Sequence, residues 1–188
     1  MNFTRKLILD NVRRIFYPRS GNLVKEVLDV NLLRFRNGET VKLIGIEPAQ
    51  VDKDLAKAFI KKLTSGHVIT LHMDKEKYDS DKNILAYVFI KEDNALKVKE
   101  AIKITGKENK ISYIEFLPED YQFPEGYWDI DRFGNRSINP SFAAKEKPQG
   151  DLFVFLNATL LNYRFANFVS MPPNTQYDSY FKTCFREA

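Results

Sequence analysis

The chain has 188 residues, and its content of 44% hydrophobic and 29% charged residues is typical of a folded globular protein rather than a disordered one. A formal charge of +4 and a pI near 9.0 favour binding of polyanions, but a charge of this size does not by itself indicate nucleic acid. The single cysteine, Cys184, excludes an internal disulfide, and no apolar run approaches the ~20 residues that span a bilayer. The first residues lack the apolar block of a signal peptide, so a cytoplasmic protein and a mature fragment both stay open.

The first 22 residues are expected to form a helical extension ahead of the main domain. Leu7, Ile8 and Val12 recur near helical spacing, with basic residues between them. This pattern predicts a basic amphipathic helix over residues 3–16 that packs against the body of the protein.

Residues 27–50 are expected to form a hairpin around which the domain is organised. Apolar residues such as Leu33 and Val41 flank Asn37 and Gly38 on either side. Asn-Gly tolerates the positive φ of a type I′ turn, so the sequence predicts two strands joined by that turn.

Apolar spacing also predicts the elements that follow the hairpin. Alternating or continuous apolar runs indicate strands, and recurrence every three or four residues indicates helices. The prediction is a helix over 51–63, strands over 67–73 and 84–90, a helix over 95–102, strands over 111–116 and 152–156, a helix over 157–165 capped by Asn157, a short strand over 167–170 and an amphipathic helix over 176–188 with Cys184 buried on it.

The order of these elements predicts an α+β protein built on a small five-stranded β-barrel of the OB-fold type. The domain is expected to span residues 23–188. Residues 91–150 contain a long segment rich in Pro, Gly and aromatic residues, which is unusual for a structureless loop. That segment is therefore expected to be an insertion that folds onto the body.

Four stretches of the chain resemble the staphylococcal nuclease (thermonuclease) homologues. They are V-L-D-V-N with N-G-E-T-V-K-L-I-G-I-E-P, then D-L-A-K-A-F-I-K-K-L with H-V-I-T-L-H-M-D, then I-L-A-Y-V-F, and finally L-N-A-T-L-L-N-Y-R-F-A-N-F-V-S-M-P-P-N-T-Q-Y-D-S-Y-F. The resemblance implies an OB-fold barrel with helices. It also implies phosphodiester hydrolysis with a calcium ion, which two aspartates and a threonine carbonyl hold while a glutamate activates water and two arginines stabilise the phosphate.

The resemblance places the metal site on altered residues. The two metal aspartates correspond to Asn31 and Glu47, and Asp29 is expected on the same strand face as Asn31. Calcium prefers charged oxygen ligands, and Asn31 offers only a neutral carbonyl oxygen. We therefore expect calcium, if it binds, to be held by Asp29, Asn31 and Glu47, with fewer charged ligands than in the family site.

The catalytic positions are altered as well. The two arginines correspond to Lys42 and Asn83, and the glutamate base falls at Ala49. Lysine keeps the charge but loses the planar fork of arginine, and loss of a single transition-state donor typically costs ~10² to 10³ in rate. Lys42 and Glu47 are the residues left that could serve catalysis, with Glu47 as a substitute base.

Three functions follow from this pattern. The first is a nuclease-like domain without full activity that binds nucleic acid or a protein partner. The second is an active calcium-dependent phosphodiesterase with a rearranged site, and the third is an interaction protein that binds through residues 91–150. Nucleic acid is expected to contact a lysine patch, with Tyr78 or Phe35 stacking on a base. The lysines are Lys57, Lys61, Lys62, Lys75, Lys77 and Lys82.

Overall fold

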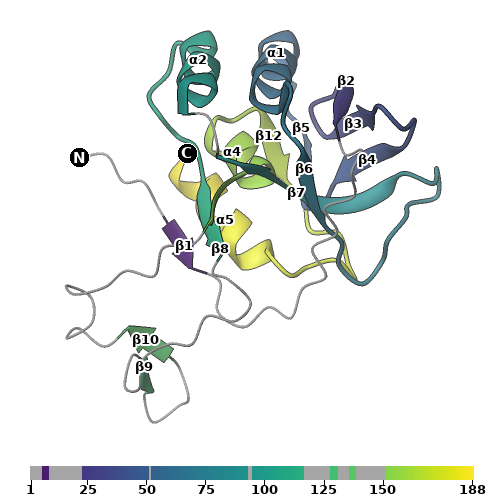
Figure 1. The fold of residues 1–188 in the computed structure, drawn as a ribbon. Coiled ribbons are helices and arrows are strands. Elements are labelled where there is room, and N and C mark those ends of the chain that lie inside the picture. The colour runs from purple at the N-terminus through teal and green to yellow at the C-terminus, as the bar shows by residue number, and fades with distance from the viewer. Residues whose placement is uncertain are drawn as a thin grey trace.

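The computed structural model describes residues 6–8, 23–50, 52–92, 95–116, 128–130, 136–138 and 151–188. These residues form an α+β fold, as predicted, in which helices cover a mixed sheet (Figure 1). No closed barrel is seen among the described residues. The described helices are α1 Lys53–Thr64, α2 Ala95–Thr105, α4 Leu156–Asn162 and α5 Asp178–Glu187.

The main sheet runs in the order β1-β8-β11-β7-β4-β3-β2, and β6 pairs with β7 off this path. Two short pairs lie apart from it, β5 Ile46–Pro48 with β12 Ala166–Phe168 and β9 Trp128–Ile130 with β10 Arg136–Ile138. The strands of the main sheet are β1 Lys6–Ile8, β2 Val24–Asp29, β3 Leu32–Phe35, β4 Thr40–Leu43, β6 Ile69–His72, β7 Ile84–Lys91, β8 Tyr113–Phe116 and β11 Asp151–Phe155.

The main sheet is mixed, with both antiparallel and parallel pairs along this path. The pairs β2–β3, β3–β4, β6–β7, β7–β11 and β8–β11 are antiparallel, whereas β4–β7 and β1–β8 are parallel. An isolated antiparallel bridge also joins Leu23, just before β2, to Val68, just before β6.

The predicted helix over residues 3–16 is wrong at the residues that the structure describes. Lys6–Ile8 form β1, which lies parallel to β8. Recurring apolar residues are compatible with either an edge strand or one face of a helix. At residues 6–8, pairing with β8 selects the strand. The rest of residues 1–22 lies outside the described residues.

The two strands predicted around Asn37 and Gly38 are confirmed as β3 and β4, but residues 27–50 also hold the end of β2 and the whole of β5, and the turn is of another type. Gly38 has a φ of +90°, whereas Asn37 keeps a negative φ. The Gly38 amide donates to the Phe35 carbonyl at 3.1 Å, and the Phe35 amide donates to the Glu39 carbonyl at 2.8 Å. This is the three-residue loop with a glycine bulge, so one left-handed residue is enough where a type I′ turn needs two.

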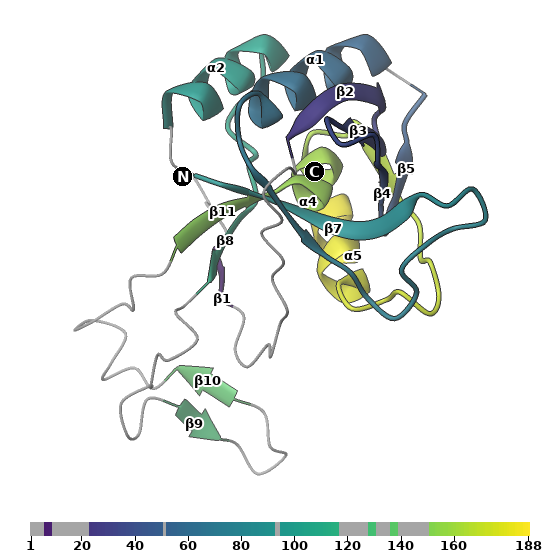
Figure 2. The ribbon, with the colours of Figure 1, turned by 45° about the vertical axis from the view of Figure 1, so that its right-hand side comes forward.

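The core lies around β7, whose residues are buried except at its last position. Aromatic rings from distant segments meet there, with Tyr87 on β7 4.5 Å from the ring centroid of Tyr177 and Phe89 4.5 Å from that of Phe155. On another side, Phe59 of α1 is fully buried. Helices α1 and α2 lie side by side as an outer layer (Figures 1 and 2).

Asn157 was predicted to cap the helix that follows β11, and this prediction is wrong. The helix begins one residue earlier, and Asn157 is fully buried within its first turn. Its side-chain oxygen accepts the Val88 amide at 2.9 Å, and its side-chain nitrogen donates to the Ile44 carbonyl at 2.8 Å. The β4 pairing of β7 ends at Ala86 and the β11 pairing begins at Phe89, so Asn157 fills the gap between the two ladders.

The first part of the predicted insertion is integrated with the body. The predicted helix and strand over 95–102 and 111–116 are α2 and β8, and they pack on α1 and pair with β11. The strands β9 and β10 form a separate antiparallel pair. The other residues of 117–150 lie outside the described residues.

Candidate nucleic-acid site

The residues expected to hold calcium do not share one strand. Asp29 ends β2, and Asn31 lies in the tight turn that leads into β3, so the prediction of a common strand face is wrong. The Asn31 carbonyl accepts the Leu43 amide at 2.8 Å, and its side-chain nitrogen donates to the Ile46 carbonyl at 3.3 Å. Asn31 therefore joins the turn to the start of β5.

The carboxylates near this turn have other surroundings. The Oδ1 atom of Asp29 accepts the Val30 amide at 2.8 Å, and its Oδ2 atom lies 4.0 Å from Nζ of Lys53. Glu47 is exposed on β5, opposite Asn167 of β12. Among the described residues, no three His, Cys, Asp or Glu side chains come together as a metal-binding group. Asp29, Asn31 and Glu47 therefore do not form the cluster of charged oxygens that calcium prefers.

Lys42 and Asn83, the residues that correspond to the two arginines of the resembled family, lie in one polar network. Its Nζ atom is 3.4 Å from Oδ2 of Asp79, a carboxylate whose side chain is only 12% exposed. The same carboxylate accepts the backbone amide of Asn83 at 2.9 Å and its side-chain amide at 3.0 Å. Thr40 donates to the side-chain oxygen of Asn83. The cation of β4 is thus neutralised within the protein.

The ionisation of Asp79 fits this arrangement. Burial disfavours the charged form, but the hydrogen bonds from Asn83 and Lys42, with the lysine charge, outweigh burial and lower the pKa of the carboxyl group. Asp79 is therefore ionised at neutral pH. A phosphate group that approached Lys42 would meet this negative charge as well.

The position expected for the base offers no functional side chain. Ala49 is buried, and its backbone amide donates to the Phe165 carbonyl at 3.1 Å. Within the described part of the chain, Lys42 pairs with Asp79 and has no hydrogen bond or ion pair with Glu47. The two residues expected to retain catalysis do not form a pair.

Of the two aromatic residues expected to stack on a base, the structure leaves one accessible. Phe35 is fully buried in the core, so that prediction is wrong, whereas Tyr78 is 56% exposed. Tyr78 lies in the loop of residues 73–83 between β6 and β7, where it forms an isolated bridge with Ile84. The same loop also carries Lys75, Lys77 and Lys82, and all three side chains are exposed.

Asn174 fixes this loop against the C-terminal part of the chain. Its side chain is buried, accepts the Glu76 amide at 2.7 Å and donates to the Glu76 carbonyl at 2.9 Å. Asp74 accepts the Gln176 amide at 3.1 Å. The lysines and Tyr78 are thus carried by a loop whose backbone is held in place.

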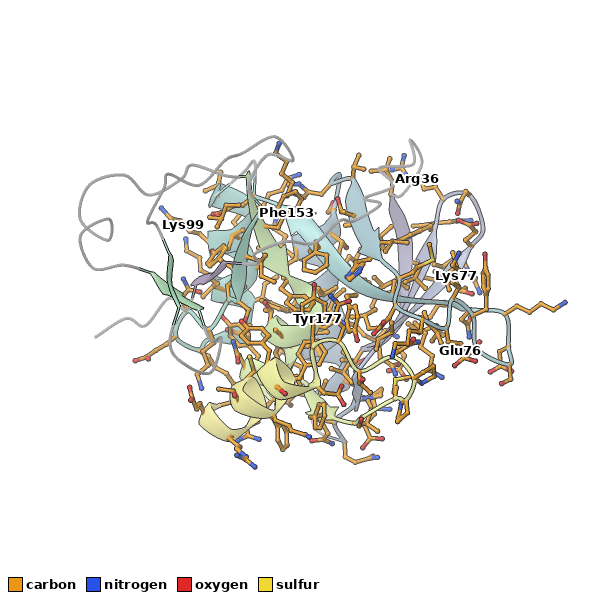
Figure 3. All side chains as sticks on the ribbon, turned by 90° about the horizontal axis from the view of Figure 1, so that it is seen from below. Arg36, Glu76, Lys77, Lys99, Phe153 and Tyr177 are labelled. Atoms are coloured by element: carbon orange, nitrogen blue, oxygen red, sulfur yellow. The ribbon has the colours of Figure 1, made fainter. Side chains whose placement is uncertain are left out.

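The six lysines expected to form one patch fall into two groups. Lys57, Lys61 and Lys62 lie on α1, which packs against α2, and the other three lie on the 73–83 loop. Figure 3 shows Lys77 of the loop and Lys99 of α2 at opposite sides of the molecule. The structure therefore presents two separate basic surfaces.

Comparison with known protein families and with curated proteins gives no match. The resemblance to the thermonuclease homologues accordingly stands on the residues quoted for it. In the part of the chain that is described, no helix combines the length and apolar character needed to cross a lipid bilayer.

Proposed function

We propose that this chain is a thermonuclease-like OB-fold domain that binds single-stranded nucleic acid without cleaving it. The fold part of the proposal is supported by the connections of β2, β3, β4, β6 and β7. An OB-fold is a five-stranded, partly open Greek-key barrel. The meander β2-β3-β4, the parallel pair β4–β7, the antiparallel pair β6–β7 and the isolated Leu23–Val68 bridge are neighbour relations that such a barrel would have, and they support this part of the proposal.

The absence of cleavage in this proposal is supported by the state of the site. Lys42 is neutralised by Asp79, and Asn83 is held by Thr40 and Asp79. Stabilisation of a phosphoryl transition state needs cationic donors aimed at developing negative charge. Neither residue meets that need.

Binding is assigned to the 73–83 loop on one main observation: this loop carries the exposed ring of Tyr78 together with three exposed lysines. In OB-folds the loop between the fourth and fifth strands contacts oligonucleotides, and the corresponding connection here is the one between β6 and β7. Aromatic rings stack on unpaired bases while lysines follow the phosphates. Tyr78, Lys75, Lys77 and Lys82 supply both kinds of contact.

A labelled oligothymidylate titrated at two salt concentrations tests this function. The Tyr78→Ala variant should bind roughly fivefold to 150-fold more weakly, because one stacked base contributes about 1–3 kcal/mol. Replacing Lys75, Lys77 and Lys82 by alanine should lower the salt slope by about 2, since each single-strand phosphate contact contributes roughly 0.7. The matched control, Lys61→Ala on α1, should leave both quantities unchanged.

Two results would overturn the proposal. Cleavage of single-stranded DNA that depends on calcium and stops with a chelator would favour the active phosphodiesterase with Lys42 and Glu47. Failure of the wild-type protein to bind any oligonucleotide at low salt would leave a protein partner, including one that contacts residues 91–150.

A further inference from the structure

The outer layer formed by α1 and α2 concentrates the positive charge of the protein. The two helices hold seven lysines against Asp54 and Glu100, a formal charge of +5, whereas the whole chain carries +4. The remainder of the chain is therefore close to neutral. A positive field of this kind, on one face, attracts polyanions.

The structure shows which of these lysines are engaged within the protein. Lys62 forms a 2.5 Å ion pair with Glu100 across the two helices, and Lys97 donates to the Ser65 carbonyl at 2.8 Å. Lys53 lies 4.0 Å from Asp29. Among the described residues, the other four lysines form no ion pair within 4.0 Å. They are Lys57, Lys61, Lys99 and Lys103.

The pKa of Glu100 indicates that several lysines lie close to this carboxylate. The hydrogen bond and charge of Lys62 lower the pKa of Glu100, and the charges of Lys103 and Lys97 lower it further. Three cations thus act on one carboxylate, which can neutralise only one of them. Of the four lysines without an ion pair, Lys61, Lys99 and Lys103 are exposed and Lys57 is half-buried.

Aliphatic side chains lie among these cations. Leu96 is 63% exposed and Ile104 is 38% exposed, both on α2. Leu96, Lys99 and Lys103 recur at i, i+3 and i+7, so they share one stripe of the helix. We define the helix-pair surface as Lys57, Lys61, Lys99 and Lys103 with Leu96 and Ile104.

This composition suits a lipid surface better than a nucleic acid. Helices α1 and α2 contain no arginine, and the aromatic residue of α1, Phe59, is fully buried. The surface therefore lacks the aromatic platform for unpaired bases that Tyr78 gives the 73–83 loop, and its lysines are point charges without the planar fork of arginine. Lysines around exposed Leu and Ile are instead typical of peripheral binding to anionic membranes, where charge attracts and aliphatic groups enter the interface.

We propose that the helix-pair surface docks the protein on anionic phospholipid membranes. This function is separate from oligonucleotide binding, because Lys99 and the 73–83 loop lie at opposite sides of the molecule (Figure 3). The lysines supply attraction to the headgroups, and Leu96 with Ile104 supply apolar contact.

Sedimentation with lipid vesicles tests this inference. The protein should sediment with vesicles of phosphatidylcholine and phosphatidylglycerol, should not sediment with phosphatidylcholine alone, and should be released by salt. Each lysine near an anionic surface contributes about fivefold to binding, so replacing Lys61, Lys99 and Lys103 by alanine should weaken it roughly a hundredfold. Leu96→Ser should weaken it without a change of charge. These side chains are exposed, and circular dichroism should show an unchanged fold.

The matched control removes the same charge from the other basic surface. Alanine at Lys75, Lys77 and Lys82 should leave vesicle binding unchanged while reducing oligonucleotide binding, so the two proposals can fail separately. The inference is overturned if the wild-type protein does not sediment with anionic vesicles at low salt, or if the two triple variants lose vesicle binding equally. It is also overturned if Leu96→Ser has no effect, or if the helix variant loses oligonucleotide binding in place of vesicle binding.

Discussion

Replacing Asn157 by leucine tests the connection that joins the two halves of the sheet. The side chain accepts the Val88 amide and donates to the Ile44 carbonyl, and all three residues are fully buried. Leucine has a similar volume but no polar atoms. The substitution therefore leaves one buried N–H and one buried C=O without these partners at the point where β7 passes from β4 to β11.

The expected loss follows from the two orphaned groups. Each buried backbone group that loses its partner costs about 1–3 kcal/mol. The added apolar burial of leucine offsets about 1 kcal/mol of that loss. We expect the free energy of unfolding to fall by roughly 1–5 kcal/mol, centred near 3 kcal/mol, which is a large share of the ~5–15 kcal/mol that stabilises a typical domain.

Urea unfolding followed by circular dichroism measures this loss, with Asn162→Leu as the control. Asn162 lies on the same helix and makes two hydrogen bonds, to the Lys110 carbonyl and the Ser112 hydroxyl, but it is only partly buried. Water can replace its partners, so the control should lose about 1 kcal/mol or less. An Asn157→Leu midpoint within experimental error of the wild-type midpoint, at equal m-value, would refute the reasoning.

Three further outcomes are expected. Gly45→Ala should lower the melting temperature more than Gly38→Ala does: both glycines have positive φ, at +80° and +90°, but only at Gly45 would the new Cβ meet a neighbour, the Phe181 ring at 2.6 Å. The pKa of Asp79 is lower in the folded protein than its ordinary value of 3.8. The ionised carboxylate therefore stabilises the fold fully at a pH above 3.8, and this stabilisation is lost as the pH falls through the folded-state pKa. The stability difference between wild type and Asp79→Asn, measured by urea titration across pH, should therefore shrink below pH 3.8, and a pH-independent difference would contradict this. Asn174→Ala should speed hydrogen exchange of the loop amide that it holds and weaken oligonucleotide binding, whereas unchanged exchange would show that the loop is fixed elsewhere.

The elements that the sequence predicted correctly are those with a strong local pattern. The continuous apolar run of β7 and the apolar face of α1 indicate burial without reference to the rest of the chain. The Asn37-Gly38 pair marks the hairpin in the same way, because glycine permits a backbone conformation that other residues avoid. Local patterns were sufficient for the α+β class.

The predictions that failed depended on partners far away in the chain. Residues 6–8 form a strand because β8 lies beside them. Asn157 joins two parts of the sheet because the fold brings Val88 and Ile44 next to it, although they are 69 and 113 residues away in the chain. Short segments with weak periodicity fit more than one structure, and tertiary contacts select among them.

The candidate site divides along the same line. The sequence by itself determined that a lysine and an asparagine, Lys42 and Asn83, stand where the resemblance would place arginines. Only the tertiary structure decided that Asp79, 37 residues after Lys42, neutralises it, and that the lysines form two surfaces instead of one. The reason is physical: charge and hydrogen bonding act over a few ångströms in space, and folding alone determines which distant side chains come within that range.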